Sequence, residues 1–208
     1  MKIHGIQHGS RVNGPELRSV VWTQGCSLAC PGCWNPATHS FDAGTEYTPE
    51  DLARKILNEC AVGTKGLTIS GGEPMQQADR LLDFMREVKA YRPDWSIGLF
   101  AGYTLPELIF GDFRVMSRAY TAKYRQLLWH SIRRQLDFAT VGRYDRTKPI
   151  DPASDTLLDN RADLRLVSST NQSVELFSTR YTLADFPSLS VEYSIDANGL
   201  FQVTGFPV

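Results

Sequence analysis

The order of predicted strands and helices is the feature that most constrains the fold of this chain. Short runs rich in apolar and β-branched residues alternate with helical patterns, and turn-forming residues separate them. Such an alternation favours a mainly parallel sheet with helices packed against it. The predicted strands cover 19–23, 66–70, 96–100, 138–141 and 164–167, and helices begin near residues 48, 77 and 105.

The length of the chain favours a partial barrel over a complete one. A complete (β/α)8 barrel usually takes about 250 residues, whereas this chain has 208. We therefore predict an α/β fold in a single domain, 1–208, in which about 173–208 form a C-terminal extension.

One predicted helix has clear start signals and ends near an isolated cysteine. Thr48 can cap its first turn, Pro49 suits the first helical position, and acidic residues follow near the positive helix end. Cys60 falls near the end of this helix. We interpret Cys60 as a small buried hydrophobe and not as a metal ligand.

The composition is ordinary for a soluble globular protein. Charged residues make up 22% of the chain, hydrophobic residues 42%, and the net charge is −1. This charge gives no general attraction to nucleic acid or to acidic membranes. No apolar run approaches the roughly 20 residues that cross a bilayer, and the start of the chain lacks a signal segment. We expect a cytoplasmic protein without nucleic-acid or membrane partners.

Three closely spaced cysteines are the strongest chemical signal in the sequence. Cys26, Cys30 and Cys33 follow the spacing C-x3-C-x2-C directly after the first predicted strand. An iron–sulfur cluster that carries electrons is normally held by four cysteine thiolates. Three thiolates would hold three irons of a cubane cluster and leave the fourth iron open to a small molecule.

Other interpretations of the three cysteines are weaker but remain open. Their spacing would place them on one face of a helix, yet Pro31 and Gly32 lie inside the run and disfavour a helix interior. A structural zinc site could use His8 or His39 as its fourth ligand. Four cysteines also permit disulfides, although nothing indicates export to an oxidising compartment.

Two further loops follow predicted strands, as the cysteine loop does. Gly71-Gly72-Glu73-Pro74 follows the second strand, and Gly102-Tyr103-Thr104 follows the third. Active sites of parallel α/β folds collect at the carboxyl ends of the strands, so the three loops are expected to face one ligand. Glycine there lets the backbone approach a ligand. Glu73 would meet a cationic group or cap the helix that begins beyond Pro74.

With these motifs in order, the chain resembles the radical S-adenosylmethionine (SAM) proteins. More narrowly, it is similar to the activating proteins of glycyl-radical enzymes, those of anaerobic ribonucleotide reductases above all. The C-x3-C-P-G-C-W-N form is much more specific than three spaced cysteines alone. The stretches that carry the resemblance are Val12 to Pro15, Gly25 to Asn35, Leu67 to Pro74, Gly102 to Leu108, and Ser168 to Gln172.

The resemblance implies a cofactor set and its residues. It implies a partial (β/α)6-type barrel, a [4Fe–4S] cluster and SAM chelated to the open iron. Cys26, Cys30 and Cys33 would be the cluster ligands. The residues that would flank SAM are Gly32, Cys33 and Trp34, with Gly71, Gly72 and Glu73 at its methionine end.

The resemblance also implies a reaction. Reductive cleavage of SAM would give a 5′-deoxyadenosyl radical that takes a hydrogen atom from a glycine of a partner glycyl-radical enzyme. A flavodoxin or ferredoxin would donate the electron. The alternatives are a radical SAM enzyme acting on a peptide or small molecule and, more remotely, a zinc or electron-transfer module.

Two positions depart from the pattern that this family commonly shows. Glu16 stands where the early Gly-Pro-Gly motif has its second glycine, and Val141-Gly142-Arg143 stands where a loop commonly begins with Asp-Gly. Contacts that the family makes through these two loops are therefore not carried over to this chain.

Two segments allow both a structural and a binding interpretation. The segment 113–136 holds six Lys or Arg residues and no acids. It is expected either to be a solvated helix with Leu127, Leu128, Ile132 and Leu136 toward the core, or to dock an acidic patch of a partner.

The second segment lies near the C-terminus. Two alternating runs, 191–195 and 200–204, flank an Asn-Gly turn and predict a β-hairpin. We expect it to close the edge of the barrel by packing, with presentation of strands to a partner as the alternative.

Overall fold

The computed structural model describes residues 1–150, 166–186, 190–195, 199 and 201–206. Its main feature is a seven-stranded sheet with the strand order β3-β1-β2-β4-β5-β6-β7. The four central strands run parallel, whereas β1, β3 and β7 are antiparallel to their neighbours. The strands are β1 (Lys2–Ser10), β2 (Arg18–Thr23), β3 (Thr45–Glu46), β4 (Gly66–Gly71), β5 (Ser96–Ala101), β6 (Phe138–Val141) and β7 (Ser173–Leu176).

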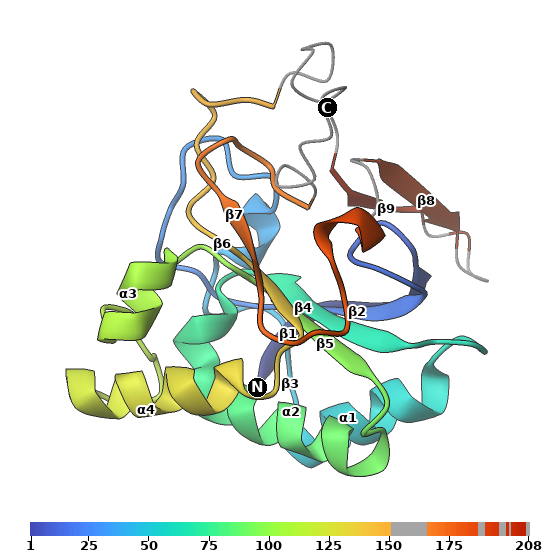
Figure 1. Ribbon diagram of the computed structural model, residues 1–208, viewed down its shortest axis with the longest axis horizontal. Helices are drawn as coiled ribbons and strands as arrows, with labels where there is room; N and C mark the ends of the chain where they lie inside the picture. The colour runs from blue at the N-terminus through green and yellow to red at the C-terminus, as the bar shows by residue number, and fades with distance from the viewer. Residues whose placement is uncertain (151–165, 187–189, 196–198, 200, 207–208) are drawn as a thin grey trace.

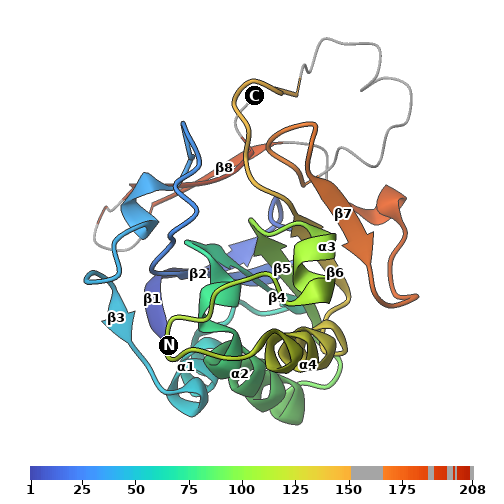
Figure 2. The same ribbon diagram turned by 90° about the vertical axis from the view of Figure 1, so that its left-hand side faces the viewer.

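Helices cover one side of this sheet (Figures 1 and 2). Figure 2 shows α1, α2 and α4 side by side, with α3 nearer the loops at the opposite end. The α-helices are α1 (Pro49–Glu59), α2 (Ala78–Tyr91), α3 (Leu105–Phe110) and α4 (Ala122–Arg133), and short 3-10 turns cover Pro36–Thr38 (η1), Pro74–Gln77 (η2) and Leu183–Asp185 (η4).

The core lies between the sheet and the helix layer. Its apolar side chains come from the central strands and from the inner faces of α1, α2 and α4, which bury one side and leave the other in solvent. Ile56, Ile69, Phe84, Leu99 and Ile132 are all completely buried. This packing fixes the parallel strands and therefore the positions of the loops at their carboxyl ends.

Local sequence signals explain where the helices begin. The Thr48 side chain accepts a hydrogen bond from Asp51 N, and Pro49 is the first residue of α1. At α3, Thr104 and Glu107 form a reciprocal capping box. Gly111 ends α3 in the left-handed conformation with φ of 72°.

Most predicted elements are confirmed. The strands predicted at 19–23, 66–70, 96–100 and 138–141 match β2, β4, β5 and β6, and the helices match α1, α2 and α3. The antiparallel strands β1, β3 and β7 were not predicted.

The strand predicted at 164–167 is wrong in its described half. Leu166 lies in a turn and Val167 has no regular secondary structure. The φ angle of Leu166 is 56°, which is not a strand conformation. Residues 164 and 165 lie outside the described part of the chain.

The basic segment contains α4, as the helical interpretation expected. Leu128, Ile132 and Leu136 are buried, but Leu127 is 56% exposed, so its placement toward the core was wrong. The helix belongs to the layer at the end of the molecule away from the strand-end loops (Figure 1). Docking through this segment stays a prediction.

The predicted C-terminal hairpin is confirmed, and it packs against the rest of the protein through Thr204 and Phe206, whereas closure of a barrel edge stays a prediction. Strands β8 (Val191–Ile195) and β9 (Phe201–Gly205) pair antiparallel in a separate two-stranded sheet. The last strand of the large sheet is β7, so the hairpin does not extend that sheet's edge. The architecture is thus a mixed α/β fold with a large, mostly parallel sheet, which is compatible with a partial barrel.

Among the described residues, no helix combines the length and the apolar character needed to span a membrane.

Candidate functional site

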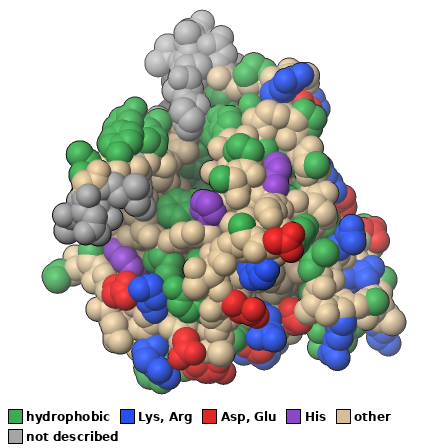
Figure 3. Space-filling view, turned by 180° about the vertical axis from the view of Figure 1, so that it is seen from behind, with side chains coloured by type: hydrophobic (Ala, Val, Ile, Leu, Met, Phe, Trp, Pro, Cys, Tyr) green, Lys and Arg blue, Asp and Glu red, His purple; other side chains and the backbone are tan. Residues whose placement is uncertain are grey.

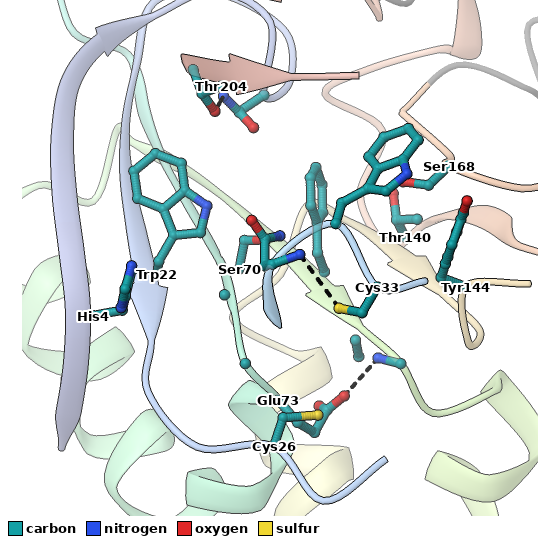
Figure 4. Close-up of a pocket in the computed structure, with 18 of the residues that line it drawn as sticks. His4, Trp22, Cys26, Cys33, Ser70, Glu73, Thr140, Tyr144, Ser168 and Thr204 are labelled. Carbon is teal, nitrogen blue, oxygen red and sulfur yellow. Dashed lines mark hydrogen bonds between the residues drawn. The ribbon is translucent and has the colours of Figure 1, made fainter. Parts of the chain in front are cut away.

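A cavity of about 590 Å³ lies at the carboxyl ends of the parallel strands. Its lining joins the cysteine loop, the loops after β4 and β5, the loop after β6, and the C-terminal hairpin (Figure 4). The three loops singled out in the sequence therefore face one space, as expected from their positions after consecutive strands. The predicted site residues among the lining are Cys26, Cys30, Cys33, Trp34, Gly71, Gly72 and Glu73.

Backbone hydrogen bonds fix the cysteine loop at both ends. Gly25 N donates to Thr38 O at 2.8 Å, and Cys26 N donates to His39 O at 3.1 Å. Within the loop, Cys33 N donates to Cys30 O at 3.1 Å. The Cys33 Sγ accepts a hydrogen bond of 3.4 Å from Asn35 N (Figure 4).

The donor set fits an iron–sulfur cluster. Three half-buried, free thiols line the same cavity, and thiolates are the ligands that such clusters take. No three His, Cys, Asp or Glu side chains of the described residues already converge as a metal-binding group. The agreement thus rests on ligand type and shared cavity, not on a preformed geometry.

The other candidate ligands lie differently. His39 lines the cavity, whereas His8 does not. The His8 ring bonds Ser19 Oγ at 2.9 Å instead. The Cys60 thiol donates to Leu57 O at 3.3 Å at the end of α1 and packs against the core. This confirms that Cys60 is not part of the cysteine cluster.

Burial holds two of the three thiols in the protonated form. It raises the pKa of Cys26 to about 11 and also raises the pKa of Cys30. A bound cation reverses this effect because a coordinating thiol is deprotonated by the metal. Cluster binding would therefore release protons from these positions.

Gly71 at the end of β4 and Gly72 directly after it allow the β4 loop and the cysteine loop to meet. Gly72 N donates to Thr23 O at 2.8 Å, and Glu73 N donates to Gly25 O at 3.0 Å. A Cβ at Gly72 would collide with the Gly25 carbonyl group, and a Cβ at Gly71 would collide with the Thr23 backbone. The glycines serve a backbone–backbone contact here, in addition to lining the cavity.

Glu73 is completely buried and accepts two backbone hydrogen bonds. Met75 N donates to Oε1 at 2.9 Å and Gly102 N donates to Oε2 at 2.6 Å. The first bond confirms the capping interpretation, since Glu73 caps η2. Burial raises the pKa of this carboxyl to about 7, against the opposing effect of the two amides.

Gly32 and Trp34 lie at the outer side of the cysteine loop. Gly32 has φ of 74°, and a Cβ there would lie 3.2 Å from Arg146 Cδ. The Trp34 ring packs at 5.5 Å from the ring of Tyr144 and at 6.3 Å from that of Phe206. Although Gly32 does not line the cavity, its neighbours Cys33 and Trp34 do.

Several lining residues escaped the sequence analysis. Those labelled in Figure 4 are His4 in β1, Trp22 in β2, Ser70 and Thr140 near the ends of β4 and β6, Tyr144 in the loop after β6, and Thr204 on the hairpin. Ser70 and Thr140 could have been found, because each lies in a predicted strand close to its carboxyl end. His4 and Thr204 could not, because their approach depends on strand pairings that local pattern does not encode.

The motif around Gln172 does hold the site together. Gln172 Oε1 accepts from Ser168 N at 2.7 Å, and its Nε2 donates to Gly142 O at 2.8 Å. These bonds join the turn before β7 to the loop after β6, and both segments line the cavity.

The two departures from the family pattern have visible consequences. Glu16 has φ of 65°, a conformation that favours glycine, and its carboxylate accepts hydrogen bonds from Tyr181 OH and Arg180. Arg143 makes two bonds of 2.7 and 2.8 Å to Glu107. This guanidinium lowers the pKa of Glu107 to about 2.

Comparison with known proteins also indicates an iron–sulfur cluster domain. Residues 12–174 match the model of a 4Fe-4S single cluster domain. The chain is 40% identical over 101 residues to the anaerobic ribonucleoside-triphosphate reductase-activating protein of Vibrio cholerae, covering 47% of this chain and 65% of that protein. It is 32% identical over 120 residues to the protein of the same name from Escherichia coli K12, covering 56% and 78%.

A third relative carries a different name. The pyruvate formate-lyase-activating enzyme of Clostridium pasteurianum is 38% identical over 91 residues, which are 42% of this chain and 38% of that enzyme. The chain thus spans just under two thirds of the Vibrio cholerae protein and a smaller share of this one. The matched cluster model and the relatives place the chain in the family of iron–sulfur enzymes that includes these activating proteins.

Proposed function

We propose that the protein is a radical SAM activase that generates a glycyl radical in a partner enzyme. The observation that carries the proposal is the meeting of three free cysteines, the Gly-Gly-Glu-Pro loop and the Gly-Tyr-Thr loop around one cavity at the strand ends. The names of the relatives supply the partner class, anaerobic ribonucleoside-triphosphate reductase or pyruvate formate-lyase.

Cys26, Cys30 and Cys33 would hold a [4Fe–4S] cluster through their thiolates. When bound there, the cluster and SAM supply one-electron cleavage of a carbon–sulfur bond, which gives methionine and a 5′-deoxyadenosyl radical. The hydrogen atom would come from a glycine of the partner, and a flavodoxin or ferredoxin would provide the electron. No general acid or base is needed for this reaction.

The chain's own residues would bind, orient and shield the reactants. Glu73 offers a buried carboxylate that attracts the ammonium group of an amino acid. Gly71 and Gly72 would lie beside the same end of SAM, and Trp34 would pack at the outer side. The aromatic group of Trp34, Tyr144 and Phe206 would exclude water from the cavity.

Anaerobic reconstitution with iron and sulfide tests this proposal. After dithionite reduction and addition of SAM, the wild-type protein should form 5′-deoxyadenosine, measured by chromatography. The Cys30→Ala variant should form none, because it lacks one cluster ligand, whereas Cys60→Ala should retain the activity. A loaded and reducible cluster that never cleaves SAM, with or without a partner reductase, would contradict the proposal.

A further inference from the structure

The C-terminal hairpin carries an apolar face that its own fold leaves uncovered. In the pairing of β8 with β9, Tyr193 lies opposite Val203, and Ile195 lies opposite Phe201. Because side chains alternate along a strand, these four residues share one face, which we call the outer hairpin face. Their exposed fractions are 67%, 54%, 71% and 56% in the order named.

The opposite face of the hairpin is polar and turns toward the protein. Thr204 is buried, and its hydroxyl accepts a hydrogen bond of 2.9 Å from Asn13 Nδ2. Glu192, paired with Thr204, has one enclosed carboxylate oxygen without a hydrogen-bond partner among the described residues. An antiparallel sheet normally packs its apolar face on the core and leaves its polar face in water. This hairpin has the reverse arrangement.

The hairpin is seated at the rim of the cavity. Phe206 follows β9, is buried, and packs against the rings of Phe100 and Trp34 at 5.9 and 6.3 Å. Val203 belongs both to the outer hairpin face and to the cavity lining. Figure 4 shows β9 with Thr204 across the cavity from Glu73 and Cys26. The outer hairpin face is therefore continuous with the opening.

The side of the hairpin and the helix layer differ in the side chains that they show on the face drawn in Figure 3. Figure 3 shows hydrophobic side chains in the upper half of the molecule, on the side of the hairpin, and Lys, Arg, Asp and Glu side chains concentrated lower down. The basic helix α4 lies in the helix layer, away from the strand-end loops (Figure 1). Residues of β9 line the cavity, whereas no residue of α4 does.

We propose that the outer hairpin face docks the partner polypeptide whose glycine enters the cavity, which rests on the function proposed above. The occupant follows from continuity: a glycine within a protein chain brings flanking backbone and side chains, and Val203 leads from the cavity onto this face. Its aromatic and branched side chains fit an extended apolar segment. Each strand pairs only with the other within the described residues, and an extended partner segment would add backbone hydrogen bonds at an outer strand edge.

The test measures binding separately from SAM cleavage. The reconstituted full-length chain is immobilised and titrated anaerobically with the anaerobic ribonucleoside-triphosphate reductase of Vibrio cholerae. The hairpin variant combines Tyr193→Ser with Phe201→Ser, two exposed residues outside the cavity lining. The matched control combines Phe110→Ser with Leu127→Ser, which are 62% and 56% exposed in the helix layer.

The hairpin variant should weaken binding by about tenfold or more, as loss of central aromatic contacts does, while the control binds as the wild type. Binding should also change little between low and high salt, because the contact is apolar. The hairpin variant should cleave SAM without partner at the wild-type rate. That readout belongs to the proposed function, so its failure in wild type and variant alike would count against the function and not against the docking face.

Equal binding by wild type and hairpin variant would overturn the docking proposal, as would a wild-type protein that does not bind the reductase. Sedimentation of the chain alone distinguishes the remaining occupant. A wild-type dimer that the hairpin variant dissociates would assign the face to a second copy of this chain and would equally overturn the proposal.

Discussion

At the scale of single residues, Glu73 shows how burial and hydrogen bonding compete. Two backbone amides stabilise its carboxylate form, yet complete burial dominates and raises the pKa to about 7. Since the folded-state pKa lies above the unfolded value, the folded protein binds this proton more tightly. The stabilisation that comes from the proton on Glu73 is therefore complete below about pH 4.5. It is lost as the pH rises to about 7.

This sign gives a testable pH dependence for the apoprotein. Relative to Glu73→Gln, which does not titrate, wild-type stability should fall by about 3 kcal/mol between pH 4 and pH 8. Denaturant unfolding under anaerobic conditions at several pH values measures both proteins, and their difference cancels the other titrating groups. A difference that does not vary with pH would show that Glu73 titrates normally.

The residue at position 16 shows how one substitution can exchange backbone freedom for a long-range contact. Glu16 pays the strain of a positive φ but joins the N-terminal loop to Tyr181, 165 positions later. In the wild-type background, Glu16→Gly should remove the hydrogen bonds and also relieve the backbone strain. In a Tyr181→Phe background, the same substitution should change the free energy of unfolding more favourably, by about 1 kcal/mol.

Equilibrium unfolding of the two single variants, the double variant and the wild type measures this coupling. Additive effects of the two substitutions would mean that the Glu16–Tyr181 contact adds nothing to stability.

At the scale of elements, the site depends on the contact between the β4 loop and the cysteine loop. Gly72→Ala should push the Gly25 carbonyl group away and displace the cysteine loop, because the new Cβ would overlap that group. We expect a loss of bound iron after reconstitution, measured by iron and sulfide analysis. Gly5→Ala is the control, since a Cβ there meets nothing within 4 Å. Full iron content in Gly72→Ala would refute this role.

The same scale shows which elements sequence can reveal. Strands β2, β4, β5 and β6 were predictable because each is a continuous apolar run between turn residues. Strand β1 was missed because Gly5, His4 and His8 interrupt its pattern, and β7 because it is short and largely exposed. Both owe their strand structure to pairing with a neighbour.

At the scale of the whole molecule, the site is assembled from segments far apart in the chain. The meeting of the cysteine, β4 and β5 loops followed from their places after parallel strands. The place of the hairpin beside the cavity could not be predicted in the same way. The hairpin forms a separate sheet and is joined by contacts such as Asn13 to Thr204, 191 positions apart. The local sequence pattern predicted the hairpin but not its position against the cavity.

The most direct test of the account concerns the open iron. The protein reconstituted with iron-57 is examined by Mössbauer spectroscopy before and after addition of SAM. A cluster held by three cysteines should respond at one iron site, so that about a quarter of the signal shifts while the rest stays constant. A spectrum that SAM leaves unchanged, or bound metal that is not a four-iron cluster, would contradict the account.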